Sequence, residues 1–165
     1  MSWLITEDGV SVDALDKEHM TAVHYASKSG NGKAVSLLLS LRADINRQNL
    51  TGWTPLALAG NKGHVHICCM LIEALADVNI HAHHQVSCLH RAAARGNEEL
   101  AELFVRNGAD FRHADGLRSY TAVHHAAAEG NVGCLLFFVG ESRERLDYVT
   151  KWGETVLHLG KPSTI

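Results

Sequence analysis

The chain has 165 residues, of which 46% are apolar, and its formal net charge is −3. This composition supports a folded core, excludes a disordered chain and gives no general attraction to nucleic acid or to anionic membranes, and the apolar stretches are too short to span a bilayer. The four cysteines do not form the framework of a small secreted domain, so we expect reduced thiols in a cytoplasmic or nuclear protein.

A six-residue motif recurs along the chain and begins at Thr21, Thr54, Ser87, Thr121 and Thr155, at intervals of 33, 33, 34 and 34 residues. A fixed period of this length indicates stacked helical units that bury their apolar faces on one another. We therefore predict an all-α fold, a solenoid of stacked helix-turn-helix units joined by β-hairpin-like loops. The expected divisions of this single domain are a partial unit (1–14), four repeats (15–47, 48–80, 81–114 and 115–148) and an incomplete fifth repeat (149–165).

The second repeat shows the expected local structure most clearly. Gly52 suits a tight turn, Thr54 can cap a helix, and Pro55 then occupies the first helical position, where its missing N–H costs nothing. Gly63 is expected to end this helix. A longer second helix follows in each of the four repeats, and the predicted ranges in chain order are Lys33–Ser40, Val65–Ala74, Glu98–Asn107 and Asn131–Val139.

The second repeat also carries the features of a known family. Thr54-Pro55-Leu56 opens the motif, Gly63-His64 precedes the second helix, and Ala76-Asp77-Val78-Asn79 closes the unit. This pattern resembles the ankyrin repeat, and the similarity extends over about residues 10 to 160. The resemblance implies an ankyrin-repeat solenoid that binds a segment of another protein through its concave face. We expect a monomer with no enzyme activity and no cofactor, and weaker packing after Glu141, where the pattern becomes irregular.

Histidines are numerous and invite two interpretations. The spacing of His81, His83, His84, Cys88 and His90 suggests zinc ligands. However, Cys88 occupies the proline position of the motif, and His90 shares the fourth motif position with His24, His124 and His158. The resemblance implies that these four imidazoles bond the motif Thr or Ser and nearby backbone. We therefore expect no metal, and we expect Cys68 and Cys69 to be inert thiols in a helix.

The resemblance places partner binding on the hairpin tips and on the exposed face of the first helices. The apolar candidates, expected to be partly exposed, are Met20, Tyr25, Trp53, Leu58, Val86 and Tyr120. The basic candidates beside them are Lys28, Lys62, Arg91, Arg95 and Arg118, and His125 occupies the fifth motif position, which faces the groove. Exposed aromatic and arginine side chains dominate interface energies. The alternative for Tyr25 and Leu58 is that they only pack against the neighbouring hairpin.

Two other functions stay open. The chain could be a regulatory module of a larger enzyme or membrane protein, or its basic strip could bind nucleic acid or a small anion, although the net acidic charge disfavours the latter. The resemblance also implies that Asn46 and Asn79 occupy the position at which some ankyrin proteins are hydroxylated. Each has a leucine eight residues earlier, Leu38 and Leu71.

Overall fold

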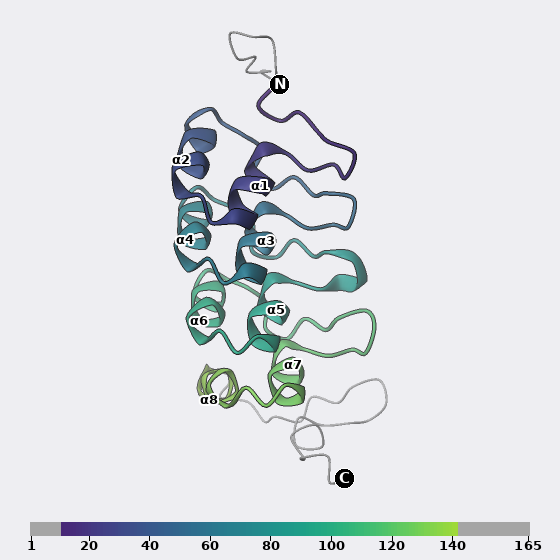
Figure 1. Ribbon diagram of the computed structural model, residues 1–165. Helices are drawn as coiled ribbons and strands as arrows, with labels where there is room; N and C mark the ends of the chain where they lie inside the picture. The colour runs from purple at the N-terminus through teal and green to yellow at the C-terminus, as the bar shows by residue number, and fades with distance from the viewer. Residues whose placement is uncertain (1–10, 142–165) are drawn as a thin grey trace. The chain divides into compact units, whose positions relative to one another are not determined.

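The computed structural model describes residues 11–141, which form eight α-helices and one short 3-10 turn (Figure 1). These residues divide into two compact units between His83 and His84. The first unit contains α1 (Ala22–Ser29), α2 (Gly32–Ser40), α3 (Pro55–Lys62) and α4 (Val65–Glu73). The 3-10 turn η1 (His83–Gln85) spans the division, and the second unit contains α5 (Cys88–Ala94), α6 (Glu98–Arg106), α7 (Ala122–Ala128) and α8 (Val132–Glu141).

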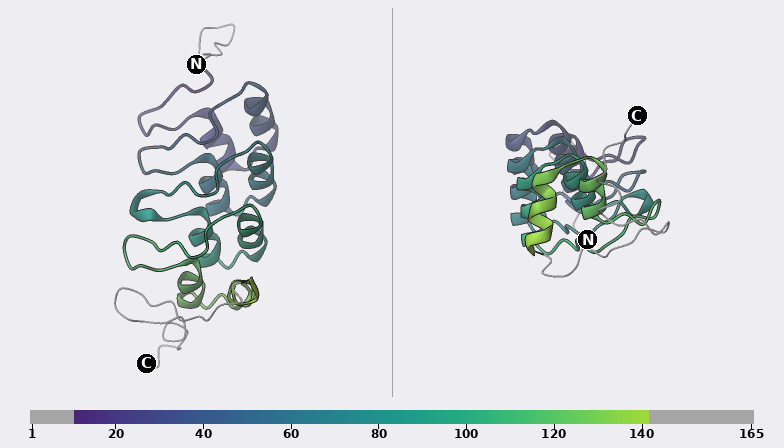
Figure 2. Two further views of the ribbon diagram at one scale, coloured as in Figure 1. Left: turned by 180° about the vertical axis from the view of Figure 1, so that it is seen from behind. Right: turned by 90° about the horizontal axis from the view of Figure 1, so that it is seen from below.

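Each unit is built from two helical hairpins in two layers. In the first unit, α1 packs on α3 and α2 packs on α4, while α1 and α3 each contact the second helix of their own hairpin. The second unit repeats this arrangement with α5 on α7 and α6 on α8. Figure 2 shows that, within each unit, the loops preceding the first helices extend away from the second-helix layer. The predicted all-α helical-repeat architecture is thus confirmed for the described residues.

The helix boundaries follow the expected capping chemistry. The side chain of Thr54 accepts a hydrogen bond from the amide of Ala57 at 3.2 Å, and Pro55 occupies the first turn of α3. Asn31 and Asn97 cap α2 and α6 in the same way through the amides three residues later. The predicted second helices agree with the observed ones to within two residues at either end. The end of the fourth repeat, the fifth repeat and His158 lie outside the described residues.

The core of each unit consists of aliphatic and aromatic side chains contributed by both helical layers. Those buried in the first unit include Val23, Val35, Leu56, Ile67 and Leu71, and those buried in the second include Leu89, Leu100, Phe104, Val123 and Phe138. None of the helices between residues 11 and 141 has the length and the continuous apolar character that a bilayer crossing needs.

We expect Gly52→Ala to lower the free energy of unfolding by about 2 kcal/mol. The substitution combines the strain of a positive φ with a close contact between the added Cβ and neighbouring backbone. Gly52 has φ of 79°, and an added Cβ would lie 3.0 Å from the Cα of Ala82 and from the amide nitrogen of His83. Gly108→Ala is the matched control, since Gly108 has φ of 85° with no atom near the added Cβ. Urea unfolding should therefore show a smaller loss for Gly108→Ala, and equal losses would exclude a contribution from the backbone contact.

Candidate functional site

The motif histidines are structural ties at the base of the surface formed by hairpins and first helices. Nδ1 of His24 accepts hydrogen bonds from the amide and the hydroxyl of Thr21, at 3.1 and 2.8 Å. Its Nε2 must then carry the proton, and it donates to the carbonyl of Trp53 in the next repeat at 3.1 Å. The sequence-based role of His24 is confirmed, because the ring joins two successive repeats within the first unit.

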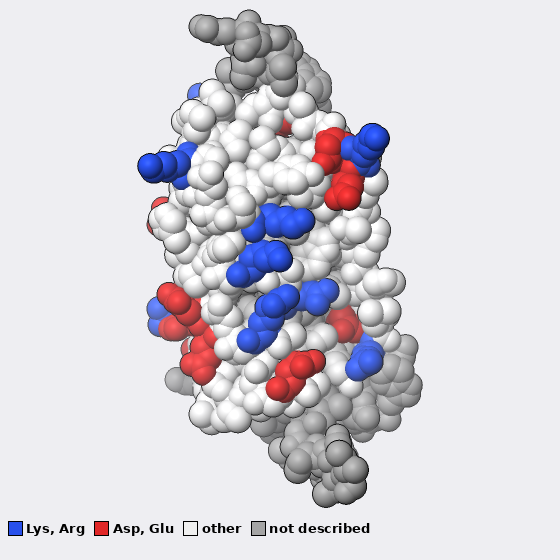
Figure 3. Space-filling model, in the orientation of Figure 1, with Lys and Arg blue, Asp and Glu red and all other residues white. Residues whose placement is uncertain are grey.

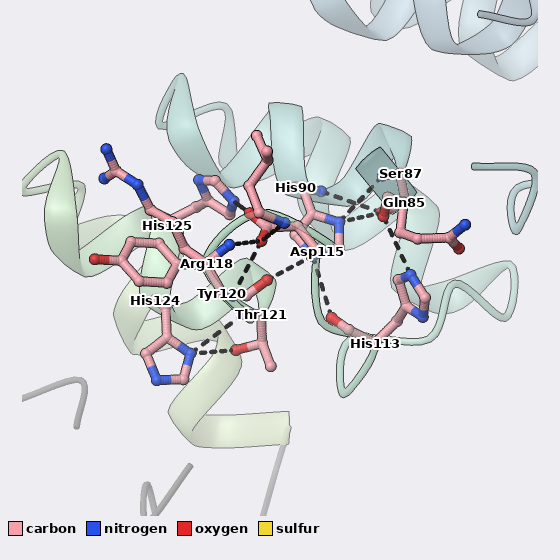
Figure 4. Close-up of polar contacts among 11 residues, drawn as sticks. Gln85, Ser87, His90, His113, Asp115, Arg118, Tyr120, Thr121, His124 and His125 are labelled. Atoms are coloured by element: carbon pink, nitrogen blue, oxygen red, sulfur yellow. Dashed lines mark hydrogen bonds and ion pairs between the residues drawn. The ribbon is translucent and has the colours of Figure 1, made fainter. Parts of the chain in front are cut away.

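His90 plays the same part in the second unit (Figure 4). Its Nδ1 accepts from the amide and hydroxyl of Ser87, at 3.1 and 2.7 Å, and its Nε2 donates to the carbonyls of His113 and Tyr120, at 3.1 and 3.0 Å. Burial, followed by the charges of the neighbouring His125 and His113, lowers the pKa of His90 to about 4. Burial also lowers the pKa of His24. His124 bonds Thr121 in the same way, through its Nδ1.

In the first hairpin loop, the carboxylate of Asp16 holds the backbone in place. One oxygen of Asp16 accepts from the amides of Glu18 and Met20, both at 2.8 Å. The other oxygen accepts from the hydroxyl of Tyr25 at 2.6 Å, which lowers the pKa of Asp16 and raises that of Tyr25. Asn49 takes the corresponding place in the next hairpin, where its side-chain oxygen accepts from the amides of Thr51 and Trp53.

Asp115 repeats this arrangement in the second unit with a histidine in place of the tyrosine. Its Oδ1 accepts from the amides of Leu117, Arg118 and Tyr120, and its Oδ2 lies 2.9 Å from Nε2 of His125. Burial alone would raise the pKa of Asp115, but the hydrogen bonds from the Arg118 amide and from His125 outweigh it, and the pKa falls below its ordinary value. Tyr25 and His125 therefore use the same motif position to bond a hairpin carboxylate.

Sequence reasoning missed these hairpin carboxylates. A signal is present in the first two hairpins, because Asp16 and Asn49 each lie five residues before the motif Thr. The pattern then breaks, since the third hairpin has Ala82 at this place and Asp115 lies six residues before Thr121.

Among the predicted binding residues of the first unit, one aromatic side chain and two lysines are exposed. Tyr25 on α1 is 50% exposed. Lys28 and Lys62 are exposed in the last turns of α1 and α3. Trp53 and Leu58 are half-buried. The expectation for Met20 was wrong: it is only 3% exposed, with its sulfur 3.2 Å from the amide nitrogen of the Asn49 side chain.

In the second unit, three of the predicted cations are exposed: Arg91, Arg95 and Arg118. Figure 3 shows basic side chains over the first helices. Val86 is half-buried, and the His125 side chain is 24% exposed. The expected exposure of Tyr120 was wrong, since it is 5% exposed, stacks on His124 at 5.7 Å between ring centroids and is covered by the guanidinium of Arg118 at 5.5 Å.

The second unit also contains a small pocket between α5 and the hairpin that precedes α7. Its volume is about 150 Å³, and Val86, Ala94 and Leu117 supply apolar walls while Asp115 and His125 lie at its polar side. Arg91 also lines the pocket, and Leu117 is 51% exposed at its edge.

The histidine and cysteine cluster of the sequence is not assembled into one site. His83 and His84 are exposed, whereas Cys88 and His90 are buried. Among residues 11–141, no group of three or more His, Cys, Asp or Glu side chains is placed to hold a metal ion. Cys68 is buried in α4 and Cys69 is half-buried there.

Comparison with known proteins agrees with the repeat architecture. Residues 1–82 and 89–160 match a family model described as ankyrin repeats in three copies. The chain is 28% identical over 118 residues to transient receptor potential cation channel subfamily A member 1 of Homo sapiens, covering 70% of this chain and 10% of the channel. It is 30% identical over 118 residues to the probable E3 ubiquitin-protein ligase XBOS33 of Oryza sativa subsp. japonica, with 70% and 23% covered.

A shorter similarity of 41% identity over 68 residues links it to protein phosphatase 1 regulatory subunit 27 of Mus musculus, with 41% of this chain and 44% of that protein covered. The chain therefore spans less than half the length of each of these relatives. The motif, the paired helices, the histidine ties and the matched residues lead to one conclusion: this chain belongs to the ankyrin-repeat family.

Proposed function

We propose that this chain is a non-catalytic scaffold that binds a segment of another protein through its hairpins and first helices. Ankyrin repeats are generally protein-interaction modules. The observation that supports this proposal most directly is the exposure of Tyr25, Lys28, Lys62, Arg91 and Arg95 on the first helices or at their ends. Aromatic and basic groups of this kind favour a partner segment, extended or helical, that carries apolar and acidic side chains.

The chemistry of the motif histidines supports a non-catalytic role. A general base needs an unprotonated nitrogen that can reach a substrate. In His24 and His90, Nδ1 already accepts two hydrogen bonds and Nε2 donates to backbone carbonyls. Both rings are buried, so we infer that they hold the backbone in place rather than transfer protons.

Trp53→Ala is expected to weaken partner binding by about 2 kcal/mol, as truncation of a central aromatic group does. Trp53 is half-buried, and its backbone is fixed by Asn49 and His24, so the indole is presented from a rigid loop. Isothermal titration with a captured partner measures the effect. Leu75→Ala, at an exposed side chain that follows α4, is the control and should leave the affinity unchanged. An unchanged affinity for folded Trp53→Ala would remove this residue from the interface.

The proposal as a whole is tested by affinity capture from the native cell lysate. Wild-type protein should retain a partner that a Trp53→Ala, Arg91→Glu double variant loses. Capture that is unchanged in the double variant would contradict the proposed surface. Binding that falls steeply with salt and survives in the absence of protein partners would instead indicate nucleic acid or another polyanion.

A second candidate function is that of a regulatory module in a larger enzyme or membrane protein. The observation that favours it is the small share of its relatives that this chain matches, 10% of a cation channel and 23% of a probable ubiquitin ligase. The length of the native gene product discriminates between this candidate and an independent adaptor. In either case we propose a cytoplasmic or nuclear location and a monomeric module.

Asparaginyl hydroxylation is a further part of the proposal. Asn46 and Asn79 are both exposed. The side-chain oxygen of Asn46 accepts from the amide of Asp77 at 2.9 Å, which links two repeats of the first unit. Incubation with an asparaginyl hydroxylase should add the mass of one oxygen at either residue, and an unchanged intact mass would exclude the modification.

A further inference from the structure

The pocket of the second unit has the size of one side chain. Its volume is about 150 Å³. Sites for drug-sized molecules typically occupy about 300–1,000 Å³, whereas an apolar cavity of about 150 Å³ accommodates benzene. The walls contributed by Val86, Ala94 and Leu117 are apolar, so burying an aliphatic side chain there is favourable.

The polar side of the pocket does not favour binding of a cation from the partner. A carboxylate offers about four acceptor positions. Oδ1 of Asp115 accepts from the amides of Leu117, Arg118 and Tyr120, and Oδ2 bonds Nε2 of His125. The Asp115 side chain is only 3% exposed and already bonds four donors within the unit, so a lysine or arginine from a partner would have little access to it.

The charges around the opening favour an acidic neighbour instead. The exposed side chain of Arg91 lines the pocket, and exposed Arg118 lies in the same hairpin as Leu117 with its guanidinium over the ring of Tyr120. These two guanidinium groups can approach a carboxylate next to an inserted side chain, and arginine is well suited to such pairs.

We propose that this pocket binds one aliphatic side chain of the partner, of the size of leucine or methionine, adjacent to an acidic residue. This inference rests on the proposed scaffold function and identifies the partner chemistry at one place on the surface. The inserted side chain displaces water from Val86, Ala94 and Leu117, and the adjacent carboxylate faces Arg91 or Arg118. The pocket therefore selects for a short apolar-acidic sequence rather than for negative charge alone.

The test uses a displayed library of random peptides of about twelve residues, selected on the purified chain, followed by titration of the enriched peptides. Ala94→Leu fills the pocket from the end of α5, and a well-folded Leu117→Ser removes one wall. Ala128→Leu is the matched control, because Ala128 occupies the same motif position one repeat later, at the exposed end of α7.

Enriched peptides should share a leucine, isoleucine or methionine beside Asp or Glu, and Ala94→Leu and Leu117→Ser should each weaken them by about tenfold or more while Ala128→Leu leaves them unchanged. Replacing the aliphatic residue of the peptide by alanine should cause a similar loss. Equal binding to wild type and Ala94→Leu, or no enrichment over an unrelated protein, would overturn the pocket proposal. Peptides that bind equally to wild type and Ala94→Leu could still bind Arg95→Glu more weakly. In that case the pocket proposal would fail and the scaffold proposal would stand.

Discussion

His90→Ala is expected to lower the free energy of unfolding by at least about 3 kcal/mol. The imidazole is buried and makes hydrogen bonds to Ser87 on one side and to the carbonyls of His113 and Tyr120 on the other. Its removal leaves a cavity, takes the acceptor from the Ser87 amide and hydroxyl, and takes one donor from each of two carbonyls. The effect should be larger than that of an ordinary core truncation to alanine of the same volume, because the loss of buried hydrogen bonds adds to the cost of the cavity.

Urea unfolding followed by circular dichroism measures this loss. His83→Ala is the matched control, since His83 is exposed and its loss should cost no more than about 0.5 kcal/mol. A His90→Ala variant within about 1 kcal/mol of wild type would show that the backbone of the third and fourth repeats is held by other contacts.

Stability is also expected to fall by about 3 kcal/mol as the pH decreases from neutral to about 4, from His90 alone. The pKa of this group drops from 6.5 to about 4 on folding, so the unfolded chain binds a proton before the native one does. The contribution is therefore fully present above pH 6.5 and is lost as the pH falls towards 4. The lowered pKa of His24 acts in the same direction.

The same unfolding experiment, repeated across this pH range, checks the expectation. His90→Gln has no imidazole to titrate, and its stability should decline distinctly less over the range than that of wild type. Asp16 and Asp115 also have lowered pKa values, but they start from 3.8, so their contributions are lost mainly below the histidine range. Parallel pH profiles for wild type and His90→Gln would contradict the burial of a neutral imidazole.

The helical framework could be read from the sequence because its determinants are local. Thr54 and Pro55 begin α3 through capping and a fixed φ, and Gly63 ends it in the left-handed conformation at φ of 77°. The histidine role was implied by the family resemblance, and its basis is also local, because Thr21 and His24 lie three residues apart and meet within a single helical turn. Such short-range relations repeat with the period of the chain.

The exposure of candidate residues was harder to infer, because it depends on which side chains pack over each position. Met20, Trp53 and Tyr120 share one motif position, yet Met20 and Tyr120 are buried whereas Trp53 is half-exposed. Tyr120 is covered by Arg118 and stacked on His124, which belong to its own hairpin and to the following helix. Periodicity identifies equivalent positions, but packing decides how much of each side chain reaches solvent.

The carboxylate ties were hidden for a different reason. The hairpin that contains Asp115 is one residue longer between the acid and the motif Thr than the hairpin that contains Asp16. Both acids nevertheless bond the side chain at the fifth motif position, Tyr25 in one case and His125 in the other. The loop absorbs the extra residue, so the contact is kept in space although its sequence interval changes.

The most direct test of the partner-binding account is hydrogen exchange of the chain with and without a captured partner. The account predicts added protection in the hairpin loops and in the first helices α1, α3, α5 or α7, with little change in the second helices. Protection confined to α2, α4, α6 or α8 would contradict it, since the proposed contacts all lie on the other layer of each repeat.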